Sequence, residues 1–171
     1  CPAQTSRSIT HFASKGAMNI DGLGPQVVEL LLSEGKIKDI ADLYTLKVED
    51  IECLERMGRK SAENLVAAIE ESKGRGLERL LYALGVRQVG EVAAEEIARK
   101  MQTLDALFDA SIDDFTAIDD IGEITATALV EFFASEDTRA LCDRIKELGI
   151  KTEAVGEARL DKLAGLTFVL T

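Results

Sequence analysis

Tryptophan is absent from the 171-residue sequence, and tyrosine and phenylalanine together make up only 5% of it. A hydrophobic core must therefore consist mainly of Leu, Ile, Val and Ala, and the share of Leu and Ala favours helices. No apolar run approaches the roughly 18 residues of a membrane-spanning helix, and no signal peptide is visible. These absences predict a helical, globular protein with no membrane partner.

Cysteine is scarce and scattered. Cys1, Cys53 and Cys142 form no close pair, so a disulfide framework is not expected and a reducing compartment, the cytoplasm, is favoured. Cys53 and Cys142 stand among helical apolar residues and are expected to be buried thiols. The sequence opens with cysteine and not methionine, which suggests a piece of a longer chain.

Positive charge is also in deficit. Twenty Lys and Arg residues face 31 Asp and Glu residues, which gives a formal net charge of -11. Nucleic-acid affinity normally rests on lysine and arginine, so the total charge argues against nucleic-acid binding. Local charge matters more than the sum, however, and the acids can lie on an opposite face.

What the sequence does contain is one short pattern repeated four times, an apolar residue followed by glycine. The spacing between successive glycines is 34, 32 and 32 residues, and a near-constant period of this size indicates a tandem array. The four pairs are Leu23-Gly24, Met57-Gly58, Val89-Gly90 and Ile121-Gly122.

Each pair stands in a fixed apolar frame. Apolar residues lie seven and four positions before each glycine and four and seven positions after it, a spacing typical of helices. The repeat is therefore predicted to be a helix, a tight turn and a second helix, which cross closely because the residue four after glycine is small. The frame consists of Ala17, Ile20, Val28 and Leu31, then Ile51, Leu54, Ala62 and Leu65, then Ala83, Val86, Ala94 and Ile97, then Phe115, Ile118, Ala126 and Leu129.

Glycine suits such a turn for two reasons. It adopts backbone angles closed to other residues, and it lets another backbone come near. The turn ends at a helix N-terminus, whose free amides carry partial positive charge. A phosphate is the natural ligand of such amides.

This frame resembles the helix-hairpin-helix motif of DNA-binding proteins, whose full form reads Gly-apolar-Gly. The first copy, Gly22-Leu23-Gly24, has the full form, whereas Arg56, Gln88 and Asp120 replace the first glycine in the others. We expect phosphate contacts at all four copies. For any single copy the alternative stays open that its turn is only structural and binds nothing.

A longer match shows that the motifs occur in pairs. With a shift of 64 residues, Leu43-Tyr44 aligns with Leu107-Phe108 and Asp50-Ile51 with Asp114-Phe115. The helix-hairpin-helix region is thus predicted to span residues 16–150, as two double modules at 16–73 and 77–150. Gly74-Arg75-Gly76 separates them.

Charge ranks the four turns. Residues 55–60 carry a net charge of +2, so Arg56, Arg59 and Lys60 are expected to add phosphate contacts at the second turn. Arg87 and Gln88 are expected to assist the third. Residues 119–123 carry -3, and the fourth turn is expected to contribute least. Each basic residue can equally be a solvated surface charge, and the weaker candidates for phosphate contact are Lys15, Arg75 and Arg79.

Local signals predict the remaining elements. Residues 1–15 show no periodicity and are expected to be irregular, and the only histidine, His11, is expected to pack or cap. Residues 151–162 are polar and predict a linker, and residues 166–171 predict a strand. Expected caps are Asp39 for a helix through Leu46, Thr103 for one through Ala110, Ser111 with Asp114 as a capping box, and Ser135 for a last helix stopped by Gly149.

Longer strings resemble the bacterial NAD-dependent DNA ligases over essentially the whole chain: Cys1-Pro-Ala-Gln, His11-Phe12, Ala17 to Gly24, Leu54 to Leu65, Leu81 to Glu91 and Val130 to Ala134. In that family a four-cysteine zinc finger precedes four helix-hairpin-helix motifs, and a BRCT domain follows. Residues 1–15 then match the end of the finger, and 151–171 match a linker and the first BRCT strand. Cys1 matches the last zinc cysteine, and no zinc site is expected because the other three ligands are absent here.

The resemblance implies an enzyme that seals nicks in DNA replication and repair, with NAD as adenylate donor and a divalent metal, magnesium or manganese, as cofactors. Its reactive lysine lies in an upstream domain, so no catalytic residues are expected in this chain. The implied role is binding of nicked duplex DNA without sequence specificity through the phosphate backbone and minor groove, alongside the rest of the ligase chain. The implied location is the cytoplasm of bacteria, at the nucleoid.

Two other functions remain open. A helix-hairpin-helix DNA glycosylase needs an aspartate after its hairpin, and none lies between Gly58 and Asp105. It also needs a pocket for an extruded base, for which aromatic residues are few. An acidic helical protein-protein docking module suits the negative charge, and it would not bind DNA even at low salt.

Overall fold

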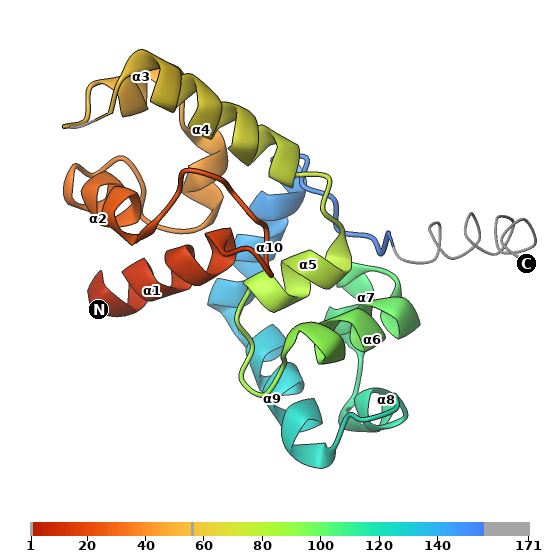
Figure 1. Ribbon diagram of the computed structural model, residues 1–171. Helices are drawn as coiled ribbons and strands as arrows, with labels where there is room; N and C mark the ends of the chain where they lie inside the picture. The colour runs from red at the N-terminus through yellow and green to blue at the C-terminus, as the bar shows by residue number, and fades with distance from the viewer. Residues whose placement is uncertain (1, 56, 156–171) are drawn as a thin grey trace, which may run out of the picture.

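The computed structural model describes residues 2–55 and 57–155, and every regular element in these residues is helical. Figure 1 shows the helices in two groups, α1 to α4 and α5 to α9, with α10 at their junction. In chain order the elements are α1 (Pro2–Ala13), α2 (Pro25–Ser33), the 3₁₀ helix η1 (Ala41–Thr45), α3 (Val48–Glu52), α4 (Arg59–Ser72), α5 (Leu77–Ala83), α6 (Glu91–Met101), α7 (Leu104–Asp109), α8 (Ile112–Thr116), α9 (Glu123–Ala134) and α10 (Glu136–Glu147).

The expectation of an irregular segment at residues 1–15 is wrong, because Pro2–Ala13 forms helix α1. Proline is tolerated in the first turn of a helix, where its missing N–H has no intrahelical acceptor to lose. Ile9, Phe12 and Ala13 lie on one face and are buried. With only these three buried apolar positions, all in the second half of the helix, the helical period is too short to detect in the sequence.

The predicted frame is confirmed at every position. All of its apolar residues, from Ala17 to Leu129, are buried. The paired helices are α1 with α2, α3 with α4, α5 with α6, and α8 with α9. The 64-residue shift is visible as well, since Leu43 in η1 and Leu107 in α7 occupy matching buried positions ahead of the second and fourth turns.

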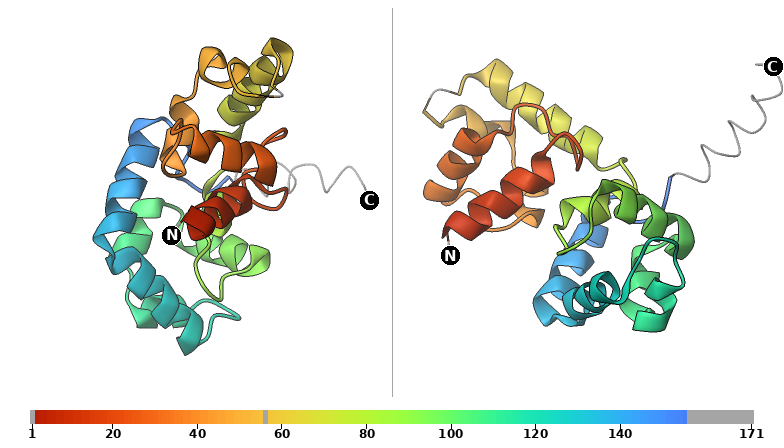
Figure 2. Two further views of the ribbon diagram at one scale, coloured as in Figure 1. Left: turned by 90° about the vertical axis from the view of Figure 1, so that its left-hand side faces the viewer. Right: turned by 60° about the horizontal axis from the view of Figure 1, so that its bottom comes forward.

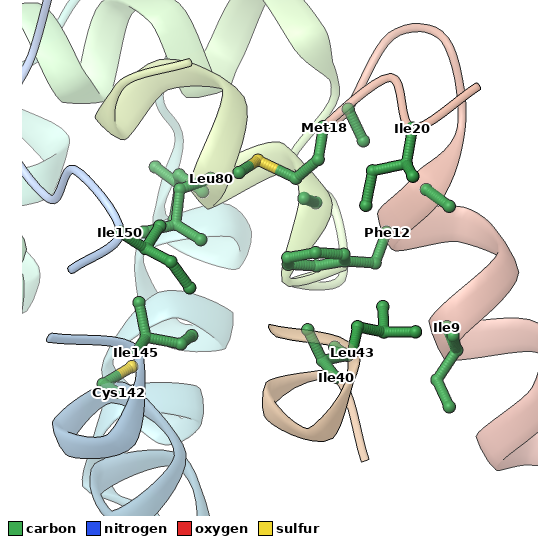
Figure 3. Packing of buried hydrophobic residues seen from close by; sticks show 14 of the residues in the cluster. Ile9, Phe12, Met18, Ile20, Ile40, Leu43, Leu80, Cys142, Ile145 and Ile150 are labelled. Carbon is green, nitrogen blue, oxygen red and sulfur yellow. The ribbon is translucent and has the colours of Figure 1, made fainter. Parts of the chain in front are cut away.

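The two modules share one core at their junction. Phe12 of α1, Leu43 of η1, Leu80 of α5 and Ile145 of α10 converge there (Figure 3). The views in Figure 2 show α10 extending along both groups of helices, and its contacts join it to η1 and to α9. The junction is therefore packed from several elements and is not a simple hinge at residues 74–76.

Residues 151–155 lie against both modules, so the predicted linker is wrong over this stretch. The amide of Lys151 donates to the Lys73 carbonyl at 2.8 Å, and the amide of Leu77 donates to the Glu153 carbonyl at 2.9 Å. The amide of Leu104 likewise donates to the Thr152 carbonyl at 3.0 Å. The rest of the expected linker and the expected strand at 166–171 lie outside the described residues.

The capping predictions had mixed outcomes. The Thr103 and Ser111 hydroxyls accept from the third amides of α7 and α8, and Asp114 completes the capping box. Asp39 accepts from the Asp42 amide, but the helix that follows is 3₁₀ and ends at Thr45. Ser135 stands before α10 without a capping hydrogen bond.

The cysteine prediction is half right. Cys142 is buried, and this burial raises the pKa of its thiol to about 12. Cys53 is exposed and was wrongly expected in the core. Among the described helices, none combines the length and the apolar character that a membrane crossing requires.

Candidate functional site

The four apolar-Gly turns have nearly the same backbone. Each glycine precedes the first residue of a helix, with φ between -91° and -87° and ψ within 10° of 180°. The apolar residue before it donates its amide to the carbonyl three positions earlier, at 3.1 to 3.3 Å. The glycine carbonyl accepts from the amide four residues later, at 2.9 to 3.0 Å. The sequence repeat is therefore a repeat of geometry.

The apolar residue of each turn anchors it, and the glycine faces solvent. Leu23, Val89 and Ile121 are buried, and Met57 is half-buried. All four glycines are exposed. The amides of the apolar residues already donate within their turns, so the donors left for a ligand are those of the glycines and of the first helical residues. The expected phosphate contacts of Leu23, Met57, Val89 and Ile121 therefore do not come from their own amides, which donate within the turns.

In the first, third and fourth turns, the residue two positions before the glycine has a left-handed backbone. Gly22 has φ of +87°, and Gln88 and Asp120 have +69° and +66°. For non-glycine residues this conformation costs roughly 1–2 kcal/mol. The full Gly-apolar-Gly form of the first copy therefore has a conformational reason. Arg56, at the same position in the second turn, lies outside the described residues.

The second glycine of the motif has no such reason. Its φ is ordinary extended backbone, so the expectation that it adopts angles closed to other residues is wrong. A Cβ added at Gly24, Gly58, Gly90 or Gly122 would meet no atom within 4 Å. Neither backbone conformation nor packing within the described residues requires glycine at these four positions.

The caps of α7 and α8 offer an internal comparison. Thr103 and Ser111 each accept an amide of the following helix at 3.2 Å. The helices after the four turns have no side-chain cap, although Ser, Asp or Asn would stabilise them better than glycine. These four N-termini therefore keep their amides uncovered, except that Pro25 contributes none to the first.

Charged side chains differ between the turns. Arg59 pairs with Glu52 at 3.5 Å and with Glu63 at 3.1 Å, both near the surface. Lys60 is exposed, and no ion pair is found for it in the described part of the chain. Arg87 and Gln88 are exposed at the third turn. The first residues of α6 and α9 are Glu91 and Glu123, so the third and fourth turns each carry a carboxylate next to the glycine.

Arg75 and Arg79, the weaker candidates for phosphate contact, both donate hydrogen bonds to backbone carbonyls. Arg75 donates from Nε to the Met18 carbonyl at 3.0 Å. Arg79 donates from one guanidinium nitrogen to the Lys15 and Ala17 carbonyls, at 2.8 and 3.0 Å. Both side chains fix the loop that leads into the first turn. Arg79 reaches this loop only in the folded chain, because 64 residues separate it from Lys15 and 62 from Ala17.

His11 has the packing role expected of it. Its Nε2 lies 2.8 Å from the Tyr82 carbonyl, and its ring packs edge-on against Tyr82 with a centroid distance of 4.8 Å. Cys1 lies outside the described residues. Within 2–55 and 57–155, no three His, Cys, Asp or Glu side chains gather in a way that could hold a metal ion.

Comparison with known families and proteins accounts for this architecture. The family described as a SAM-like helix-hairpin-helix tandem matches residues 15–71, and the helix-hairpin-helix motif family matches residues 79–142. A DNA ligase of Carboxydothermus hydrogenoformans is 50% identical over 171 residues, all of this chain and 26% of the relative. DNA ligases of Heliobacterium modesticaldum and Phocaeicola vulgatus are 48% and 47% identical, with the same coverage. The chain spans about a quarter of the length of these relatives. With helix-hairpin-helix matches in both modules and such identity along its whole length, the chain belongs to the DNA ligase family.

Proposed function

We propose that this chain binds duplex DNA without sequence specificity, by holding phosphates at the N-termini of α2, α4, α6 and α9. The observation that carries the proposal is the exposed glycine before each of these helices. Its Cβ-free surface is open, and its amide and those of the next residues have no side-chain cap. Oriented amides of this kind attract phosphate through the helix dipole.

The same geometry explains how an acidic protein can bind DNA. Main-chain amides need no formal charge, and the turns present them clear of the core. Lys60 adds positive charge beside the second turn, where Arg59 also pairs with Glu52 and Glu63. Asp119, Asp120 and Glu123 flank the fourth turn in the sequence. The second turn therefore contributes most to the affinity and the fourth least.

The relatives suggest the kind of protein in which this DNA-binding region acts. In a ligase of the NAD-dependent type, the two modules would hold the minor-groove side of a nicked duplex while other parts of the enzyme use NAD and a divalent metal to seal it. We assign this chain the binding role within such a protein.

The test is a titration of the 171-residue chain against labelled nicked duplex at several salt concentrations. Affinity should fall with salt with a log-log slope of about -0.9 per phosphate contact, hence about -3.6 for one contact at each turn. A docking module would show no DNA binding at the lowest salt, and this result would refute the proposal.

A further inference from the structure

Two exposed apolar side chains occupy the same position in the third and fourth turns. Val92 is 70% exposed and Ile124 is 76% exposed, and each lies two residues after the glycine of its turn. The corresponding residues of the first module are Gln26 and Lys60, which are polar and also exposed. The two modules thus present different chemistry at one shared position.

Neither residue is explained by the stability of its helix. β-Branched side chains lose rotamer freedom in helices and lower their propensity. At this exposure they bury little apolar surface within the protein. Single exposed apolar residues need no explanation, but two at one register of a repeat do.

Their direction places them beside the free amides. Helical Cα–Cβ bonds tilt toward the N-terminus, so side chains in the first turn of α6 and α9 lean toward the end that presents the amides. Ile124 also lines a groove of about 470 Å³ between α9 and the third turn. Arg87, Gln88 and Thr127 line it as well, together with the carboxylates of Glu123 and Glu131.

The groove favours an uncharged part of a ligand next to a phosphate. Its two carboxylates disfavour a further phosphate, and Ile124 offers an apolar contact. In a nucleic-acid strand the group that follows each phosphate is the sugar, whose C–H edges are apolar.

We propose that Val92 and Ile124 contact deoxyribose edges next to the phosphates held by the third and fourth turns. This inference rests on the proposed function. The first module then binds mainly through amides and cations, and the second adds apolar contacts where its own charge is unfavourable. A 2′-hydroxyl against these side chains would lose water without gaining a partner, so the contacts favour DNA over RNA strands.

The test replaces both residues in the 171-residue chain, as V92T with I124T, which keeps β-branching. Affinity for nicked DNA duplex should fall about 5- to 30-fold from lost apolar burial. The slope of affinity with salt should not change, because no phosphate contact is lost. The preference of the wild-type chain for DNA duplex over a DNA–RNA hybrid of the same sequence should shrink.

The matched control is I112T. Among the described residues, Ile112 is the third exposed large apolar residue, 38% exposed, and it is the first residue of α8, the helix before the fourth turn. It should leave affinity and preference unchanged. Unchanged affinity of the double variant, or lost affinity with an unchanged DNA-to-hybrid ratio, would overturn this inference alone. Failure of the wild-type chain to bind at the lowest salt would overturn the proposed function with it.

Discussion

At the scale of single residues, the central feature is a glycine that the protein itself does not require. The extended backbone and open surroundings of Gly58 and Gly122 accept a side chain without strain. Aspartate is among the best residues at the start of a helix. The same carboxylate would cover the amides and repel phosphate. Stability and DNA binding should therefore change in opposite directions at these positions.

Gly58→Asp is expected to raise the free energy of unfolding by up to about 1 kcal/mol and to weaken DNA binding. Urea denaturation and duplex titration measure the two effects. Gly122→Asp is the matched variant, with a similar gain in stability and a smaller loss of affinity, because its turn already carries three acids. Equal losses of affinity, or a larger loss for Gly122→Asp, would refute the ranking of the turns.

The cysteines differ in reactivity for a reason that the sequence pattern could not supply. Cys53 follows α3 and is exposed, whereas the Cys142 thiol is buried and its pKa is raised to about 12. In a Cys1→Ser variant, one thiol should react with a disulfide reagent at pH 8 in the folded protein, and two should react in denaturant. Two rapidly reacting thiols in the folded protein would contradict the burial of Cys142.

At the scale of elements, the strongest sequence signals were the apolar frame and the side-chain caps. Both depend on short-range contacts; the frame was confirmed throughout, and the caps were confirmed at Thr103 and Ser111 but not at Ser135. Helix α1 escaped prediction because its apolar face is short. The stretch 151–155 escaped because its hydrogen bonds join segments distant in the sequence, and polar composition alone suggests a linker.

The caps also give a prediction at this scale. Ser111→Ala removes the hydroxyl that accepts the Asp114 amide and should lower the free energy of unfolding by about 1 kcal/mol. Ser135→Ala is the control, because Ser135 makes no capping hydrogen bond with α10. Thermal denaturation measures both, and equal losses would show that the Ser111 contact stabilises nothing.

At the scale of the whole molecule, ion pairs as well as apolar packing join α10 to the first module. Arg144 pairs with Asp39 at 3.2 Å and with Asp42 at 2.9 Å. Partial burial tends to raise the pKa of Asp42, but hydrogen bonds from Arg144 and from the Lys38 amide outweigh it, and the pKa is lowered overall. The sequence could not reveal this pair, because 102 residues separate Asp42 from Arg144.

The pair predicts a pH-dependent contribution to stability. Arg144→Gln should lower the free energy of unfolding by at most about 1 kcal/mol at pH 7, because the pair is partly exposed. A carboxyl with a lowered pKa in the folded state stabilises above its ordinary value of 3.8 and loses this effect as pH falls through the folded value. The free energies of unfolding of the wild-type chain and the Arg144→Gln variant, measured by denaturation, should therefore converge as the pH falls below 3.8. A difference that persists at low pH would assign the effect of Arg144 to packing.

The four turns themselves could be located from the sequence, but the state of their amides could not. In the folded protein, the apolar residue of each turn donates its amide within the turn, and no packing contact requires the glycine. Arg75 and Arg79 donate to backbone carbonyls of the loop before the first turn. Such distinctions depend on the packed structure, which no local pattern encodes.

The most direct test of the account follows the amide resonances of Gly24, Gly58, Gly90 and Gly122 by NMR as nicked duplex is added. These four resonances should shift, Gly58 most and Gly122 least, while the amide resonance of Gly35, at an exposed turn outside the motif, stays in place. Binding of duplex with the four glycine resonances unmoved would contradict the account.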